Sequence, residues 1–177
     1  MNIFTEASGS LVSAALINSL KRAGLCVMAS DVTDMNAGAL LADKYVKVPD
    51  KHNKNLWQII KELLVTNEVD WIVPSFDEML FGWSEREEKF KADGIKLLIS
   101  PHNTIDTFLD KWKTYNAFVQ SELPVPKTSL QKEYPMVKPR QGRGSQGITI
   151  TDEMNVDMEG KISQEVVRGT ELTVDCF

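Results

Sequence analysis

The sequence predicts an α/β protein, with a helix-covered parallel sheet followed by a smaller α+β domain that contains an antiparallel sheet. Over the first hundred residues, short apolar runs alternate with longer amphipathic stretches, a pattern typical of βαβ units. This alternation ends near Pro101, after which the apolar runs follow one another without long helices between them. A glycine-rich segment, 142–147, separates two of these later runs. We therefore expect two domains, 1–101 and 102–177.

The expected strands of the first domain are short and continuously apolar, as in a sheet covered on both faces. They span 1–5, 26–30, 45–48, 71–74 and 96–99. Apolar residues repeat at helical spacing in the stretches 11–20, 56–64 and 79–90, which predicts one helix in each. Gly24 and Gly94 follow the first and third of these helices as stop signals.

The second domain is expected to begin with a helix over 103–120 that breaks near Asp110. Pro124 and Pro126 then prevent the helix from continuing, because proline lacks the backbone N–H and clashes with the preceding turn. The remaining apolar runs predict strands at 135–138, 147–151, 162–167 and 171–177. Strands joined without long helices indicate an antiparallel sheet.

Composition excludes several functional classes. Apolar residues make up 42% and charged residues 25% of the 177 residues, as in ordinary globular proteins. A net charge of −5 argues against a nucleic-acid-binding protein, which needs a basic face. The sequence shows neither a signal peptide nor an apolar run of membrane-spanning length, so we expect a cytoplasmic protein. The two cysteines and two histidines lack metal-ligand spacing, and no metal site is expected among these residues.

The glycine-rich segment matches the pattern G-x-G-x-x-G. Its residues are Gly142, Arg143, Gly144, Ser145, Gln146 and Gly147. A dinucleotide-binding loop of this pattern must open a helix, whereas β-branched residues typical of a strand follow this one. We therefore predict a hairpin whose glycines let backbone N–H groups approach an anion, with Lys138 beside it as a cation. A flexible hairpin tip with glycines chosen only for turn geometry explains the segment equally well.

Four motifs in a fixed order resemble the ATP-grasp superfamily, and within it the carbamoyl-phosphate synthase large chain and related carboxylate–amine ligases. The motifs are Pro-Val-Pro-Lys-Thr at 124–128, Tyr-Pro-Met-Val-Lys-Pro at 134–139, the glycine-rich segment, and Ser-Gln-Glu-Val-Val-Arg-Gly-Thr-Glu-Leu-Thr-Val-Asp at 163–175. The resemblance covers essentially the whole chain. It implies a Rossmann-like pre-ATP-grasp domain over 1–101 and the N-terminal lobe of an ATP-grasp domain over 102–177. It also implies ATP as cofactor, Mg²⁺ held by a C-terminal lobe after Phe177, and a small carboxylate substrate.

The resemblance further implies a role for individual residues. Lys111 and Lys138 would contact phosphate oxygens beneath the glycine-rich segment. The backbone of 164–167 would bind the adenine edge, and Glu171 would accept hydrogen bonds from ribose hydroxyls. The expected nucleotide-binding residues are Lys111, Lys138, Gly142, Arg143, Gly144, Ser145, Gly147, Gln164, Glu165, Val167 and Glu171. Without the resemblance, Lys111 is a solvated helix lysine and Glu171 an exposed carboxylate; no catalytic residue is assigned.

The chain ends within the apolar run 172–177, so we expect it to be incomplete as a ligase. It is then part of a longer ligase, a split subunit that needs a partner chain, or a non-catalytic nucleotide-binding or interaction module. Each of these predicts no ligase turnover by the 177 residues alone, and carboxylate-dependent formation of ADP would contradict that. An uncovered last strand would also favour self-association. The acceptor substrate is not specified by any residue.

Two weaker features follow expected strands of the first domain. The run Ser8-Gly9-Ser10 can bind an anion at a helix N-terminus or simply cap that helix. Asp77 and Glu78 lie where α/β sheets bind ligands, but acidic residues also favour the first turn of a helix. Trp71, Trp83 and Trp112 lie on apolar faces, which indicates packing in the core or between lobes.

Overall fold

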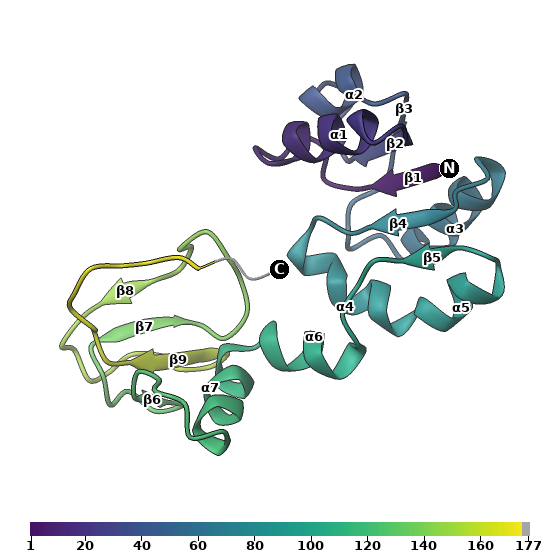
Figure 1. The fold of residues 1–177 in the computed structure, drawn as a ribbon. Coiled ribbons are helices and arrows are strands. Elements are labelled where there is room, and N and C mark those ends of the chain that lie inside the picture. The colour runs from purple at the N-terminus through teal and green to yellow at the C-terminus, as the bar shows by residue number, and fades with distance from the viewer. Residues whose placement is uncertain (175–177) are drawn as a thin grey trace. The chain divides into compact units, whose positions relative to one another are not determined.

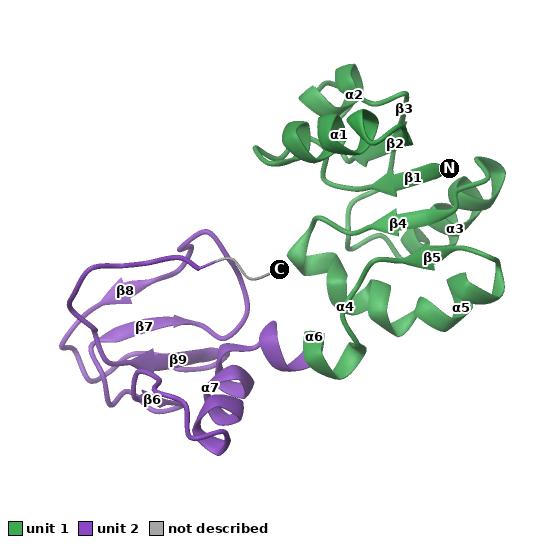
Figure 2. Cartoon of the chain, in the orientation of Figure 1, with its two compact units in different colours: residues 1–105 green, residues 106–177 purple. Residues whose placement is uncertain are grey.

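A computed structural model describes residues 1–174 of the chain. The chain divides into two compact units, Met1–Ile105 (unit 1) and Asp106–Phe177 (unit 2), and the division falls within one helix (Figure 2). Unit 1 is built on a parallel sheet and unit 2 on an antiparallel sheet (Figure 1). The predicted fold class, a parallel α/β part followed by an α+β part, is therefore confirmed.

The sheet of unit 1 has the strand order β3-β2-β1-β4-β5, and all its pairings are parallel. Its strands are β1 (Asn2–Thr5), β2 (Cys26–Asp31), β3 (Lys44–Lys47), β4 (Trp71–Val73) and β5 (Lys96–Leu97). The helices between them are α1 (Ser13–Arg22), α2 (Ala37–Leu41), α3 (Leu56–Thr66), α4 (Asp77–Glu85) and α5 (Glu87–Ala92). Strands β2 and β3 lie on one side of β1, and β4 and β5 on the other, so the strand order reverses between β1 and β4.

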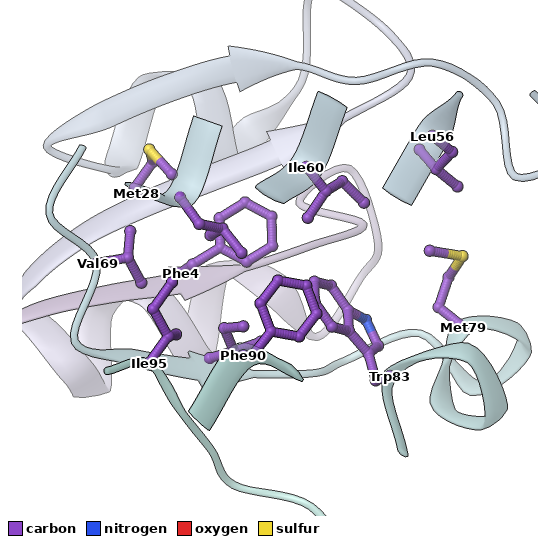
Figure 3. Packing of buried hydrophobic residues seen from close by; sticks show 11 residues of the cluster. Phe4, Met28, Leu56, Ile60, Val69, Met79, Trp83, Phe90 and Ile95 are labelled. Atoms are coloured by element: carbon purple, nitrogen blue, oxygen red, sulfur yellow. The ribbon is translucent and has the colours of Figure 1, made fainter. Parts of the chain in front are cut away.

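Two apolar clusters cover the two faces of this sheet, because successive side chains of a strand point to opposite faces. On one face Ile17 of α1 packs with Val27 and Ala29 of β2. On the other face the strand residues Phe4 and Met28 join the apolar sides of α3, α4 and α5 (Figure 3). Burial on both faces explains why the strands have continuously apolar sequences.

Trp83 belongs to the larger cluster and has no exposed surface, so its predicted place in the core is confirmed, whereas Trp71 and Trp112 are only partly buried. The ring of Trp83 lies edge-on to Trp57, with centroids 4.9 Å apart. It also contacts the rings of Phe4 and Phe90 (Figure 3). Gly82 makes this packing possible, because a Cβ at that position would lie 2.1 Å from Cζ2 of Trp57. Edge-to-face aromatic pairs of this kind stabilise a core beyond the area they bury.

Unit 2 contains a four-stranded sheet of order β6-β9-β7-β8, with antiparallel pairings. Its elements are α7 (Lys111–Gln120), β6 (Thr128–Ser129), β7 (Met136–Pro139), β8 (Thr149–Ile150) and β9 (Lys161–Gln164), and α6 (His102–Phe108) spans the division between the units. The predicted helix break is confirmed: α6 ends at Phe108, and the Asp110 carboxylate caps α7 by accepting N–H bonds from Trp112 (2.8 Å) and Lys113 (3.3 Å).

The structure corrects three predicted elements. The single helix expected over 79–90 is interrupted at Arg86, which ends α4 and precedes α5. The strand expected over 162–167 stops at Gln164. Within the strand expected over 171–177, residues 171–174 are irregular, and 175–177 lie outside the described residues. Leu172 is 82% exposed, so this apolar run lacks the sheet surface on which a β-prone sequence packs.

Candidate functional site

A chain of hydrogen bonds across three strands of unit 2 orients the ammonium group of Lys138. Lys138 lies on β7, and its Nζ donates to Oε1 of Gln164 on the neighbouring β9 at 2.7 Å. The amide nitrogen of Gln164 in turn donates to Oγ1 of Thr128 on β6 at 2.9 Å. The Thr128 hydroxyl donates to the carbonyl of Pro126, so every member of this chain of hydrogen bonds has a fixed role. Thr128, which fixes the orientation of the Gln164 amide, was not among the predicted site residues.

The first turn of α7 holds Lys111. Its backbone N–H donates to the carbonyl of Arg140 at 2.9 Å, and its Nζ donates to the carbonyl of Gly142 at 2.9 Å. Asp110, which precedes Lys111, accepts from Nη2 (2.6 Å) and Nε (3.2 Å) of Arg140. These contacts tie the start of α7 to the chain segment that enters the glycine-rich loop, and the paired bonds to one guanidinium fix its orientation.

Both lysines are partly withdrawn from water and carry charge that no acidic side chain neutralises directly. Burial lowers the pKa of Lys138, and the nearby charge of Lys111 lowers it further. Burial also lowers the pKa of Lys111, while the charge of Asp110 opposes that effect. Within residues 1–174 neither lysine forms an ion pair, and their hydrogen-bond partners are carbonyl and amide oxygens. Two desolvated, mutually repelling cations with neutral partners make a site that an anion would stabilise.

The glycine-rich loop connects β7 to β8, which pair antiparallel, so the predicted hairpin is confirmed. Four of its six residues have positive φ: Gly142 (121°), Gly144 (62°), Ser145 (58°) and Gly147 (71°). Glycine is required at 147 for a second reason, since a Cβ there would lie 2.9 Å from Cγ of Pro139. The whole loop, including Arg143, is exposed, and its backbone is therefore accessible to a ligand.

The other predicted site residues do not take part in the hydrogen bonds around Lys111 and Lys138. Glu165 pairs with Lys127: its carboxylate accepts the Lys127 N–H at 2.9 Å, and its own N–H donates to the Lys127 carbonyl at 3.0 Å. Val167 is 68% exposed, and Glu171 is also exposed. No contact within the described part of the chain joins Val167 or Glu171 to the two lysines. Gln164 takes part in these hydrogen bonds through its side chain, whereas its expected role uses the backbone of this segment.

Residues 1–174 contain neither a membrane-spanning helix nor a cluster of metal-ligating side chains. None of the helices there is both long enough and apolar enough to cross a membrane. No group of three or more His, Cys, Asp or Glu side chains in that part of the chain could hold a metal ion.

Solved structures share this fold at low sequence identity. An N5-carboxyaminoimidazole ribonucleotide synthetase from Thermotoga maritima is 19% identical with a TM-score of 0.66, over 94% of this chain and 46% of the other. An L-amino acid ligase from Bacillus licheniformis is 18% identical with a TM-score of 0.74, over 95% and 44%. The biotin carboxylase domain of a Hydrogenobacter thermophilus 2-oxoglutarate carboxylase, in complex with MgADP, ADP and bicarbonate, is 16% identical with a TM-score of 0.63, over 84% and 37%. The chain thus spans less than half the length of these proteins.

Two protein families match the sequence, one in each part of the chain. No curated protein matches it significantly. Residues 108–177 match the ATP-grasp domain, and residues 8–98, just over half of the chain, match the PylC-like N-terminal domain. Together with the parallel and antiparallel sheets, these matches place the chain in a family: it belongs to the ATP-grasp proteins with a PylC-like N-terminal domain.

Proposed function

We propose that this chain is the ATP-binding part of a ligase that activates a small carboxylate. In this reaction a carboxylate oxygen attacks the γ-phosphorus of ATP, the bond to the β-phosphate oxygen breaks, and an acylphosphate and ADP form. An amine or thiol then attacks the acyl carbon, and inorganic phosphate leaves. The observation that carries this proposal is the pair Lys111 and Lys138, two partly buried cations with neutral partners beside an exposed glycine-rich loop.

The chain's own residues have distinct roles in this proposal. Lys138, oriented by Gln164, presents a point charge to the phosphates, and Lys111 presents a second one from the start of α7. The glycine-rich loop covers the phosphates with backbone N–H groups. Bound Mg²⁺ would neutralise phosphate charge, and we expect its ligands in a C-terminal lobe after residue 177.

Further details belong to the same proposal. We assign 1–101 to the pre-ATP-grasp domain and 102–177 to the N-terminal lobe of the ATP-grasp domain. The backbone of 164–167 binds the adenine edge, and Glu171 binds the ribose hydroxyls. We further propose a chemistry similar to that of the carbamoyl-phosphate synthase large chain, a cytoplasmic location, and self-association or a partner chain at the apolar run after Glu171.

Replacing Lys138 by methionine is the experiment that tests the proposed function. It keeps the apolar stem and removes the charge, and a charge-assisted hydrogen bond is worth about 1.5–3 kcal/mol, so we expect Mg-ATP to bind about 10- to 100-fold more weakly. Calorimetric titration of the whole chain measures this. Lys161→Met is the matched control, because Lys161 lies on the adjacent β9 but donates to the carbonyl of Asp157. Equal affinity of wild type and Lys138→Met for Mg-ATP would refute the site.

A further inference from the structure

Glu6 is a buried acid in unit 1 that the proposed nucleotide site does not use. It directly follows β1 and is 6% exposed. The neighbouring strand β4 ends at Val73, and the turn 74–76 leads from there into α4. The strand order reverses between β1 and β4. Glu6 therefore lies at the carboxyl ends of the strands, at the position where α/β proteins commonly bind ligands.

The side chain and backbone of Glu6 both hold the β4–α4 segment. Nε1 of Trp83, on α4, lies 2.9 Å from each carboxyl oxygen of Glu6. Backbone hydrogen bonding from Ser75 and Phe76 in the same turn also contributes to the pKa of this carboxyl group by lowering it. In addition, Oγ of Ser75 donates to the backbone carbonyl of Glu6 at 2.5 Å. One residue after β1 therefore contacts both the turn 74–76 and the last turn of α4.

Burial governs the charge state of this carboxyl group. It raises the pKa of Glu6 to about 7, although the hydrogen bonds from Trp83, Phe76 and Ser75 lower it. The charged side chains on the surrounding elements are Asp31 on β2, Asp77, Glu78 and Glu85 on α4, Lys51 before α3 and Arg86 after α4. Asp31 accepts the N–H of Gly9, Lys51 pairs with Glu78 at 2.8 Å, and Arg86 pairs with Glu85. The shift thus arises from burial opposed by hydrogen bonds, not from an ion pair of Glu6.

We propose that Glu6 is a proton-linked latch that fastens the turn 74–76 and Trp83 to the end of β1. The latch is closed when the carboxyl group is protonated. Ionisation favours an open form in which the turn moves away and water reaches the carboxylate. The carboxyl group of Glu6 has a higher pKa in the closed form than in the open form, so protonation stabilises the closed form. This stabilisation is lost as the pH rises through about 7. The access of water and solutes to the carboxyl end of β1 therefore depends on pH in the neutral range.

The size of the effect follows from the two titration midpoints. A carboxyl group with a pKa of 4.5 when solvated and about 7 when buried makes opening about 70-fold more favourable at pH 8 than at pH 5. Hydrogen exchange of the Trp83 indole N–H and the Ser75 and Phe76 amides, corrected for the intrinsic rates, should show this increase. Glu6→Gln, which mimics the neutral form, should abolish it. Glu62→Gln, at an exposed position on α3, should leave it unchanged.

The wild-type chain alone also decides the proposal. A carbon-13 NMR titration should place the Glu6 carboxyl midpoint near 7. A midpoint near the ordinary glutamate value of about 4.5, or protection of Trp83, Ser75 and Phe76 that does not change with pH, would overturn the latch. So would the same pH-dependent opening in Glu6→Gln. None of these results depends on nucleotide binding in unit 2.

Discussion

Replacing Glu6 by glutamine is expected to remove about 2–3 kcal/mol of pH dependence from the stability of unit 1 between pH 5 and pH 8. The folded-state pKa of Glu6 is raised, so the unfolded chain loses its proton at a lower pH than the folded chain does. The stability contribution of Glu6 is therefore fully present below about pH 4.5 and is lost as the pH rises through about 7. Glutamine has no such proton to lose.

Urea unfolding of wild type and Glu6→Gln at the two pH values measures this difference. Fluorescence suits it, because Trp57, Trp71 and Trp83 all lie in unit 1. Other titrating groups affect both proteins alike, so the quantity of interest is the change with pH in the difference between their unfolding free energies. Glu62→Gln should follow wild type. A wild-type to Glu6→Gln difference that stays constant from pH 5 to pH 8 would contradict the raised pKa.

Replacing Asp110 by alanine is expected to destabilise unit 2 by about 2–3 kcal/mol. Asp110 is 5% exposed, caps α7 and accepts two hydrogen bonds from the partly exposed Arg140. Loss of a helix cap costs about 1 kcal/mol, and loss of a partly buried charged pair adds about 1–2 kcal/mol. Burial opposes ionisation of Asp110, yet the bonds from Arg140, Trp112 and Lys113 outweigh it and lower its pKa, so the ionised form is the one the fold stabilises.

Asp106→Ala is the matched control for this change. Asp106 also forms a short ion pair, 2.6 Å from Lys113, but both side chains are more than 40% exposed, so its loss should cost less than about 1 kcal/mol. Thermal unfolding of both variants and of wild type measures the difference. The Asp110 contribution should also be lost as the pH falls below the ordinary aspartate pKa of 3.8 and through the lower pKa that this carboxyl group has in the folded chain. Equal destabilisation by the two substitutions would show that the hydrogen bonds between Asp110 and Arg140 contribute little to the stability of unit 2.

Local patterns of apolar and polar residues in the sequence were sufficient to predict much of the fold. Apolar runs marked the parallel strands, a helix break was expected near Asp110, and the strand after Gly147 identified a hairpin. The helix α2 was missed because five residues are too few to show helical periodicity. Its only local signal was Asn36, which caps it by accepting the N–H of Ala39.

The candidate site was only partly predictable, for a different reason. Lys111, Lys138 and the loop glycines were identified from motifs. The hydrogen bonds from Lys138 to Gln164 and from Gln164 to Thr128 join residues 26 and 36 positions apart, and they depend on a strand order that sequence periodicity does not determine. Glu6 was missed altogether, because a glutamate after a strand normally lies in water. Its burial depends on Trp83, 77 residues away in the chain.

The central claim is that unit 2 recognises the phosphates of a nucleotide through Lys111 and Lys138. The most direct test compares the affinities of the chain for MgADP and for adenosine, which lacks phosphates, in wild type and in the double variant Lys111→Met/Lys138→Met. We predict that wild type binds MgADP at least about 10-fold more tightly than adenosine, and that this preference disappears in the double variant. Equal binding of MgADP and adenosine by wild type, or an undiminished preference in the double variant, would contradict the claim.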